Sequence, residues 1–255
     1  GRVPNCLMVG CGEYTTGYAG DGAADSDKSC GVVALVCLDL VRRGLLGPQL
    51  AMCGTNGAKM PAVREHMRRA IGDVFEGLDP AVIKTWPSDD VVDRQAYKMA
   101  ANHFEPGDVA IIFTPDDTHL EIAEYCMRKG MHVLVTKPPV KTLADHRQLA
   151  RTADECGVLC AVELHKRFDP IYADAADRIQ SLGSLSYFSS YMSQPVHQLQ
   201  TFKRWAGVDS DISYYLNSHH VDFHVWATRG RARPAAVVAL HSSGVAEGAL
   251  GGRAG

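Results

Sequence analysis

The sequence predicts an α/β protein, in which a doubly wound parallel sheet is followed by a smaller α+β domain with an antiparallel, incomplete sheet. Two observations predict this class. Before residue 163, short apolar runs with the length of buried strands alternate with helical patterns. After it, Ser184–Met192 alternates like a strand of an antiparallel sheet, and Ala235–His241 reads as one more strand. We therefore expect two domains, residues 1–163 and residues 164–255.

One strand–helix–strand unit in the first domain is especially clear. Val109–Phe113 is a buried-strand pattern, Thr114–Thr118 is a polar turn, and a helical pattern follows that closes at Gly130. A second strand is predicted at His132–Val135. Such a unit implies two parallel strands, with ligands bound at the loops that follow their C-terminal ends. Lys137 lies in one of these loops and is therefore a candidate functional residue.

The first strand, Cys6–Val9, leads directly into Gly10-Cys11-Gly12. Two glycines in this position allow a tight turn and a close approach of the backbone to a pyrophosphate. Thr15 stands where the third glycine of the dinucleotide-binding pattern is usual. The partial pattern also fits a plain glycine-rich strand end, but its context favours a dinucleotide-binding Rossmann domain.

The segment that follows departs from the usual dinucleotide-binding pattern. Tyr18–Cys30 is rich in glycine, aspartate and serine, and the first long apolar helix begins only at Gly31. We favour a single helical turn at Glu13–Gly17 with an insertion behind it. A remodelled phosphate site is the alternative.

The second strand, Leu50–Cys53, bears on the choice of cofactor. It is followed by Thr55 and Asn56, without the acidic residue that usually binds the adenosine ribose of NAD. Lys59 and Arg64 come next, and positive charge beside small polar residues suits the 2′-phosphate of NADP. We expect NAD or NADP, with NADP favoured; an ordinary polar turn before a basic helix explains the same residues.

The other predicted elements alternate in the same way. In chain order they lie at Val82–Trp86, Val91–Asn102, Leu143–Cys156, Val158–Val162 and Ile171–Leu182. The polar stretch Gln194–Asp211 is suited to a substrate lid, and a helix around His219 follows it.

Several of these segments resemble one known family. The chain is similar to the glucose–fructose oxidoreductase, inositol dehydrogenase and rhizopine-catabolism (Gfo/Idh/MocA) family of NAD(P)-dependent oxidoreductases. The resemblance rests on GCG at 10–12, TPDDTH at 114–119, TKP at 136–138, HKRFDP at 165–170 and SHHVD at 218–222. It implies an enzyme that moves a hydride between nicotinamide and a hydroxyl or carbonyl carbon of a sugar, cyclitol or related polyol.

The resemblance also implies residue roles. Lys137 would hold the reacting oxygen and stabilise alkoxide charge, and His219 would be the general acid and base. The cofactor would contact Gly10, Cys11, Gly12, Tyr14, Thr15, Thr55, Asn56, Thr114, Pro115, His119 and Lys137. The substrate would contact His165, Arg167, Tyr215 and His220.

Two residues depart from the pattern of the family. The family usually has glutamate where this chain has Thr136, and often aspartate where it has Tyr215. Both departures favour the main alternative function, a non-catalytic dinucleotide-binding regulator or scaffold.

A third functional hypothesis is a reductase of non-sugar substrates, which an apolar cleft would favour. An ion pair within the linker is the alternative for Arg167. His220 and His224 are spaced for metal binding, but we expect no metal because no further ligand has suitable spacing.

Composition narrows the class of protein further. A formal net charge of −3 gives no reason to expect nucleic acid or a membrane surface as partner. The eight cysteines form no CxxC pairs, which indicates reduced thiols, with Cys11 expected to be exposed and oxidisable. No apolar run has the length of a membrane span, and no signal peptide is visible, so we expect a cytoplasmic protein. The resemblance implies a homo-oligomer, a dimer or tetramer formed through the second-domain sheet.

Overall fold

The computed structural model describes residues 1–20, 22–24, 26, 28–195 and 210–240. The chain divides into two compact units. The first contains Gly1–Thr114 and Thr118–Ala161, and the second contains Pro115–Asp117 and Val162–Gly255. Each unit has its own internal contacts and is described by itself below.

The first unit is built on a parallel sheet. Its strands are β1 (Cys6–Val9), β4 (Leu50–Cys53), β5 (Lys84–Trp86), β6 (Val109–Ile112), β7 (His132–Thr136) and β8 (Cys160–Glu163). They lie in the order β5-β4-β1-β6-β7-β8, and Cys6 pairs with Leu50 on one side and Val109 on the other. The strand order reverses between β1 and β6, which is the switch point of a doubly wound fold. The predicted Rossmann architecture is confirmed.

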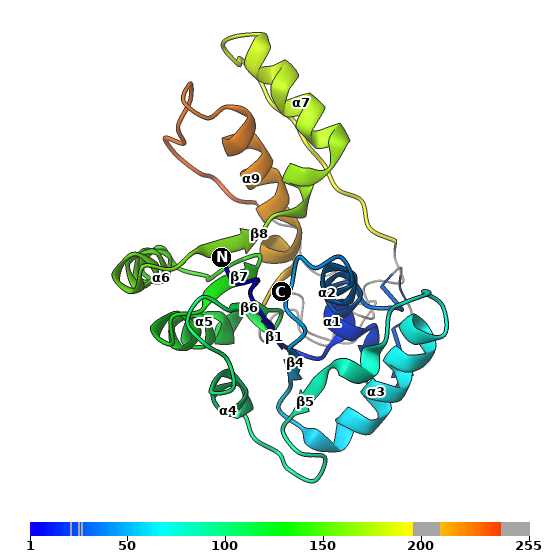
Figure 1. Ribbon diagram of the computed structural model, residues 1–255. Helices are drawn as coiled ribbons and strands as arrows, with labels where there is room; N and C mark the ends of the chain where they lie inside the picture. The colour runs from blue at the N-terminus through cyan, green and yellow to red at the C-terminus, as the bar shows by residue number, and fades with distance from the viewer. Residues whose placement is uncertain (21, 25, 27, 196–209, 241–255) are drawn as a thin grey trace. The chain divides into compact units, whose positions relative to one another are not determined.

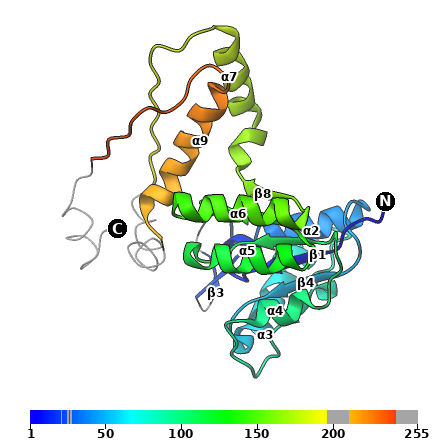
Figure 2. The ribbon, with the colours of Figure 1, turned by 90° about the vertical axis from the view of Figure 1, so that its left-hand side faces the viewer.

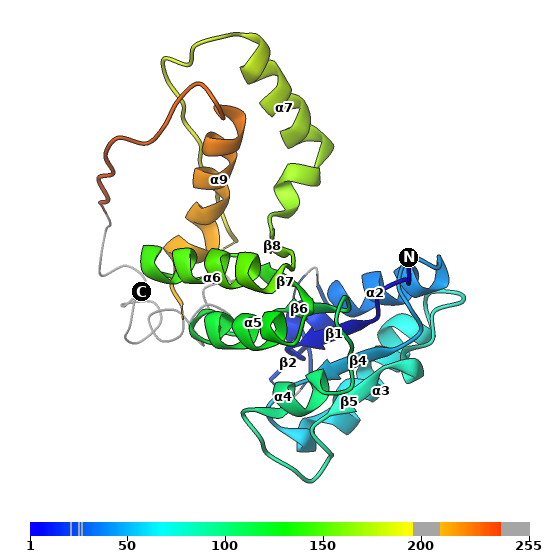
Figure 3. The ribbon, with the colours of Figure 1, turned by 60° about the vertical axis from the view of Figure 1, so that its left-hand side comes forward.

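Helices cover both faces of this sheet (Figure 1). One face carries α1 (Glu13–Thr16), α2 (Val33–Arg42) and α3 (Met60–Met67). The other carries α4 (Ala96–Ala101), α5 (His119–Arg128) and α6 (Leu143–Cys156), of which α5 and α6 lie side by side (Figure 3). Short helical turns complete the unit at η1 (Gly57–Lys59), η2 (Arg68–Gly72) and η3 (Pro80–Val82). A further turn, η4 (Asp116–Thr118), has its first two residues in the second unit.

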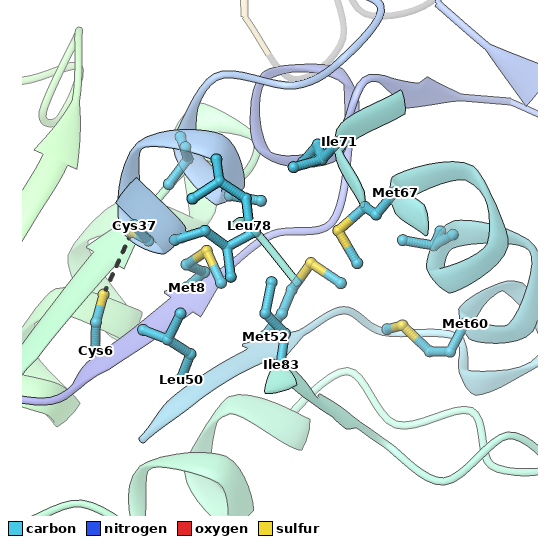
Figure 4. Close-up of a cluster of buried hydrophobic side chains, with 14 residues drawn as sticks. Cys6, Met8, Cys37, Leu50, Met52, Met60, Met67, Ile71, Leu78 and Ile83 are labelled. Atoms are coloured by element: carbon cyan, nitrogen blue, oxygen red, sulfur yellow. Dashed lines mark hydrogen bonds between the residues drawn. The ribbon is translucent and has the colours of Figure 1, made fainter. Parts of the chain in front are cut away.

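The core of the first unit lies between β1, β4 and the helices of one face (Figure 4). Met8 and Met52 come from neighbouring strands and are fully buried, as are Met60 and Met67 of α3. Burying one such side chain contributes about 1.5–3 kcal/mol. This core fixes the strands whose C-terminal ends position the candidate site.

The insertion after the phosphate turn is a small hairpin. A single turn of α1 is followed by β2 (Tyr18–Ala19) and β3 (Gly22–Ala23), which pair antiparallel. The backbone N–H of Val32 donates to the carbonyl oxygen of Tyr14 at 2.8 Å, so the chain returns to its point of departure before α2 begins. The favoured interpretation, one helical turn with an insertion behind it, agrees with this arrangement.

The second unit contains η5 (His165–Phe168), α7 (Pro170–Ser181), η6 (Ser213–Asn217) and α9 (Ser218–Ala227). Helices α7 and α9 lie side by side (Figure 2), and the rings of Tyr172 and Phe223 meet edge to face at 5.4 Å. Asp169 caps α7 by accepting a hydrogen bond from the N–H of Ile171 at 2.9 Å.

Two strand predictions for this unit are wrong. Residues 184–192 and 235–240 have no regular secondary structure, so the second-unit antiparallel sheet is not formed among the described residues. An alternating pattern becomes a strand only where a neighbouring strand accepts and donates its backbone hydrogen bonds. Most of the predicted lid, Gln194–Asp211, lies outside the described residues, as does His241.

Within the described ranges, none of the helices combines the length and apolar character needed to cross a membrane.

Candidate active site

The turn after β1 leaves room for a phosphate group. Gly10 has φ +107°, and a Cβ there would lie 2.0 Å from the carbonyl oxygen of Phe113. Only glycine fits that position. At Gly12, by contrast, a Cβ would meet no heavy atom within 4 Å, so the backbone is open to an approaching group. The turn therefore fits the pyrophosphate of a dinucleotide.

The replaced third glycine does not obstruct this turn. Thr15 is only 2 % exposed, so its side chain lies in the core rather than over the turn. The hydroxyl of Thr16 donates to the carbonyl oxygens of Cys11 and Gly12, at 3.0 and 3.1 Å, and these hydrogen bonds stabilise the turn. Tyr14 stacks on Phe113 with 5.6 Å between ring centroids, which ties α1 to the end of β6.

Cys11 differs from its sequence expectation. It is half-buried rather than exposed, and Sγ lies so close to Gly54 that a Cβ there would meet it at 2.5 Å. Burial raises the pKa of the Cys11 thiol, and the ammonium of Lys59 opposes that rise. The expected exposed, oxidisable thiol is corrected to a shielded one, because only the thiolate reacts readily.

The two basic residues after β4 are placed differently. The Arg64 guanidinium donates to the Thr85 hydroxyl at 2.7 Å and to both carboxylate oxygens of Asp89 at 3.0 and 2.6 Å. Hydrogen bonding to Asp89 raises the pKa of Arg64. Lys59 is exposed and acts electrostatically on Cys11 in the phosphate turn. Of the two, Lys59 is therefore the residue suited to a phosphate.

Thr55 and Asn56 lie in the loop that follows β4. Thr55 is exposed, and the side chain of Asn56 accepts a hydrogen bond from the N–H of Ala58 at 3.0 Å. Asn56 thus caps η1, and Thr55 is the more exposed of the two residues.

Lys137 follows β7 and is 8 % exposed. Thr114 comes shortly after β6, and its hydroxyl accepts a hydrogen bond from the Thr118 hydroxyl at 2.8 Å. Because β1, β6 and β7 are adjacent parallel strands, their C-terminal ends lie along one edge of the sheet. The phosphate turn, Thr114 and Lys137 therefore share that edge.

His119 has a different environment from the one its motif suggested. It is fully buried. Nδ1 lies 2.9 Å from the carbonyl oxygen of Pro138, and Nε2 lies 2.8 Å from the carbonyl oxygen of Thr114. Pro115, its predicted companion in the cofactor contact, is exposed and belongs to the second unit.

In the second unit, His219 is buried at 8 % exposure and lies beside His165. The two rings meet edge to face, with centroids 4.9 Å apart. Nδ1 of His165 lies 2.8 Å from Oε1 of Glu163, so the carboxylate orients that ring. The sequence did not single out Glu163; its place two residues before His165, at the end of a strand, was the available signal.

A cavity of about 280 Å³ lies next to these histidines within the second unit. Its walls include Lys166, Tyr172, Phe188, His219, His220 and Phe223. Burial and the nearby Lys166 ammonium lower the pKa of His220, so its imidazole is neutral at pH 7 and can both donate and accept a hydrogen bond. Lys166 also donates to the Tyr172 hydroxyl at 3.0 Å.

Arg167 is engaged by a carboxylate. Its Nε and Nη2 donate to the two oxygens of Asp222 on α9, at 2.9 and 2.5 Å. The pairing holds η5 against α9, rather than acting within the linker. Tyr215, the remaining predicted substrate contact, is half-buried in η6, on the turn that leads into α9.

Known proteins resemble this chain in sequence. Residues 81–164 match the oxidoreductase family with an NAD-binding Rossmann fold, Gfo/Idh/MocA. The scyllo-inositol 2-dehydrogenase (NAD(+)) of Bacillus subtilis is 28 % identical over 195 residues, covering 72 % of this chain and 54 % of that protein. A scyllo-inositol 2-dehydrogenase (NADP(+)) of the same organism is 26 % identical, covering 72 % and 51 %. The chain is therefore similar in sequence to members of the Gfo/Idh/MocA family.

Solved structures show the same fold. A scyllo-inositol dehydrogenase from Lactobacillus casei, with bound NAD(H) and scyllo-inositol, superposes with TM-score 0.61 at 13 % identity, covering 89 % of this chain and 56 % of that one. The WlbA dehydrogenase from Bordetella pertussis, in complex with NADH and UDP-GlcNAcA, gives 0.58 at 17 % identity, covering 89 % and 60 %. The chain spans about half the length of the curated relatives it matches.

Proposed function

We propose that this chain acts as an NAD(P)-dependent oxidoreductase on a hydroxyl or carbonyl carbon of a sugar, cyclitol or related polyol. The carrying observation is the shared sheet edge, which brings an open glycine turn and a buried lysine to the ends of adjacent parallel strands. Ligands of doubly wound sheets bind at this edge. The inositol dehydrogenases among its relatives support a polyol as substrate.

Each proposed residue has a separate task. A bound nicotinamide dinucleotide supplies hydride transfer. Lys137, largely shielded from water, donates a hydrogen bond to the reacting oxygen and stabilises its negative charge. His219 accepts the hydroxyl proton in oxidation and returns it in reduction.

The cavity in the second unit has the size and lining expected of a binding site for a small cyclic substrate. Its volume of about 280 Å³ lies just below the usual range for ligand pockets, about 300–1,000 Å³, and its walls combine aromatic rings with Lys166 and two histidines. Aromatic faces suit the C–H face of a sugar or cyclitol ring, and the polar groups suit its hydroxyls. Lys166 also leaves room for an acidic sugar.

Cofactor preference is proposed as NADP, on the placement of Lys59. The test is to titrate the chain with NADH and with NADPH, following tryptophan fluorescence. Lys59→Ala should weaken NADPH binding by about tenfold or more and change NADH binding little, because only NADPH carries the 2′-phosphate. Lys84→Ala, which alters an exposed lysine on β5, is the matched control. Equal loss for both cofactors removes Lys59 from the 2′-phosphate site.

The enzyme proposal is tested at Lys137. With inositols and aldoses as substrates, Lys137→Ala should lower kcat by about 10²–10³ because an electrostatic stabiliser is lost, while cofactor affinity stays within a few-fold. The exposed Lys129→Ala should leave both unchanged. Cofactor binding without turnover of any of these substrates favours the non-catalytic regulator.

A further inference from the structure

A buried histidine joins two loops of the first unit. His119 is the first residue of α5, and its ring nitrogens face the carbonyl oxygens of Thr114 and Pro138. Thr114 lies in the loop after β6. Pro138 directly follows Lys137 in the loop after β7. One imidazole therefore touches the backbone of both loops at the ligand-binding edge of the sheet.

Both partners of this imidazole are acceptors. A backbone carbonyl oxygen has no proton to give, so each bond requires a hydrogen on the ring nitrogen. Each ring nitrogen can make its bond only when it carries a hydrogen, so both loops are held at once by the form of the ring with two N–H groups. A buried donor facing a loop carbonyl fixes the loop, because a buried carbonyl without a partner is destabilised by about 1–3 kcal/mol.

The same geometry argues against direct cofactor contact by His119. Its side chain has no exposed surface, and both ring nitrogens are turned towards the main chain. We propose that His119 is a positioning residue, which places Thr114 through Nε2 and Lys137 through Nδ1. This inference rests on the proposed function of Lys137.

Two substitutions separate the two bonds. The side-chain amide nitrogen of asparagine reaches roughly the place of Nδ1, and that of glutamine reaches roughly the place of Nε2. His119→Asn keeps the Pro138 bond and releases Thr114, so it should raise KM for the dinucleotide about tenfold with little change in kcat. His119→Gln keeps the Thr114 bond and releases Pro138, so it should lower kcat about tenfold or more with little change in that KM.

Amide hydrogen exchange tests which loop each substitution releases, and it does not require turnover. His119→Asn should speed amide exchange in residues 114–118 only, and His119→Gln in residues 136–142 only. His103→Asn and His103→Gln, at an exposed histidine stacked on Trp86, are the matched controls and should change neither segment.

The outcomes distinguish this inference from the proposed function. A crossed exchange pattern in a chain that turns over no substrate supports the inference and rejects the enzyme. Turnover with both variants altered alike, in kinetics and exchange, makes His119 a general support of the fold and overturns the inference. Unchanged variants overturn it as well.

A measurement on the unsubstituted chain applies where a variant does not fold. With ¹⁵N-labelled histidine, the buried bridge requires two His119 ring N–H groups that exchange slowly with water, and a ring with one N–H or with rapid exchange overturns the inference. The His119 signal is assigned by its couplings to residues of α5.

Discussion

The two units bury their apolar side chains to different degrees. In the first, strands and helices enclose residues such as Met8, Met52 and Ile112, which are fully buried. In the described part of the second, the buried apolar side chains are Ala176 and Ala227. The first unit therefore has the core of an independent domain. The second is described best as helices joined by specific contacts.

Those contacts are polar and aromatic. Arg167 pairs with Asp222, and Lys166 donates to Tyr172, whose ring meets Phe223. Meanwhile Phe168 of η5 is 85 % exposed. Hydrophobic burial is the larger source of stability, and partly exposed ion pairs contribute little. Substitutions in the first unit should therefore change the free energy of unfolding more than substitutions in the second.

The largest effect is expected at the phosphate turn. Gly10→Ala combines a positive φ with a clash against the Phe113 carbonyl, so it should lower the free energy of unfolding by about 2–6 kcal/mol. Gly12→Ala meets nothing and has an ordinary φ, so stability should hold while dinucleotide affinity falls. Urea unfolding and NADH titration measure the pair. Equal destabilisation would show that the turn is tighter than the geometry indicates.

Core truncation should follow closely. Met52→Ala removes a fully buried side chain from β4 and should destabilise by about 2–5 kcal/mol. Ile171→Ala, at a residue 78 % exposed on α7, should change stability by less than about 0.5 kcal/mol. Thermal unfolding of both variants compares the units directly. A large loss at Ile171 would mean that this face is covered in solution, and the contrast would fail.

A smaller loss of stability is expected when the buried carboxylate of Asp108 is removed. Burial raises its pKa, but N–H groups of Glu105 and Asn5 and the Arg2 guanidinium outweigh burial and hold that pKa below its ordinary value. Asp108→Asn should therefore destabilise by about 1–3 kcal/mol at pH 7.

The pH dependence of that loss has a definite sign. The native pKa is lowered, so the contribution is fully present above the unfolded value of about 3.9 and disappears as pH falls through the native pKa. The difference between the original chain and Asp108→Asn should thus shrink below about pH 4. Urea unfolding at several pH values checks this, and a constant difference would contradict it.

The smallest effect is expected in the second unit. Asp222→Asn leaves Arg167 without its carboxylate and should destabilise α9 by about 0.2–1 kcal/mol, less at high salt. Asp174→Asn, in a more exposed pair with Arg178 on α7, is the control and should have less effect. Fluorescence of Trp226, whose ring lies 5.9 Å from the Arg167 guanidinium, follows the change. A loss above about 2 kcal/mol would place this pair among the main supports of the unit.

Local sequence patterns predicted the first unit well. The helix Leu143–Cys156 has the predicted bounds because Thr142 caps its start and Gly157, with φ +64°, ends it. The helix predicted at Val91–Asn102 begins only at Ala96, since Val92 bridges to Asn56 instead. Such a bridge joins distant residues, and local periodicity does not record it.

In the candidate site, too, local patterns predicted the positions of residues along the chain but not their partners in space. Sequence placed Lys137 and the glycine turn at strand ends, because strand boundaries follow from buried apolar runs. It did not predict that His119 faces two main-chain carbonyls or that Arg167 faces Asp222, 55 residues later. Those partners depend on how elements pack, and motifs give residue types without their neighbours.

The central position of β1 also has a consequence for synthesis on the ribosome. Its residue Cys6 pairs with Leu50 and with Val109, so β1 is translated before both of its partner strands and pairs first with β4 and much later with β6. Until β6 has emerged from the exit tunnel, one edge of β1 has no strand to pair with. The nascent sheet therefore grows outwards from β1. The side of β1 that will pair with β6 is open to chaperones before the C-terminal ends of β6 and β7 are in place.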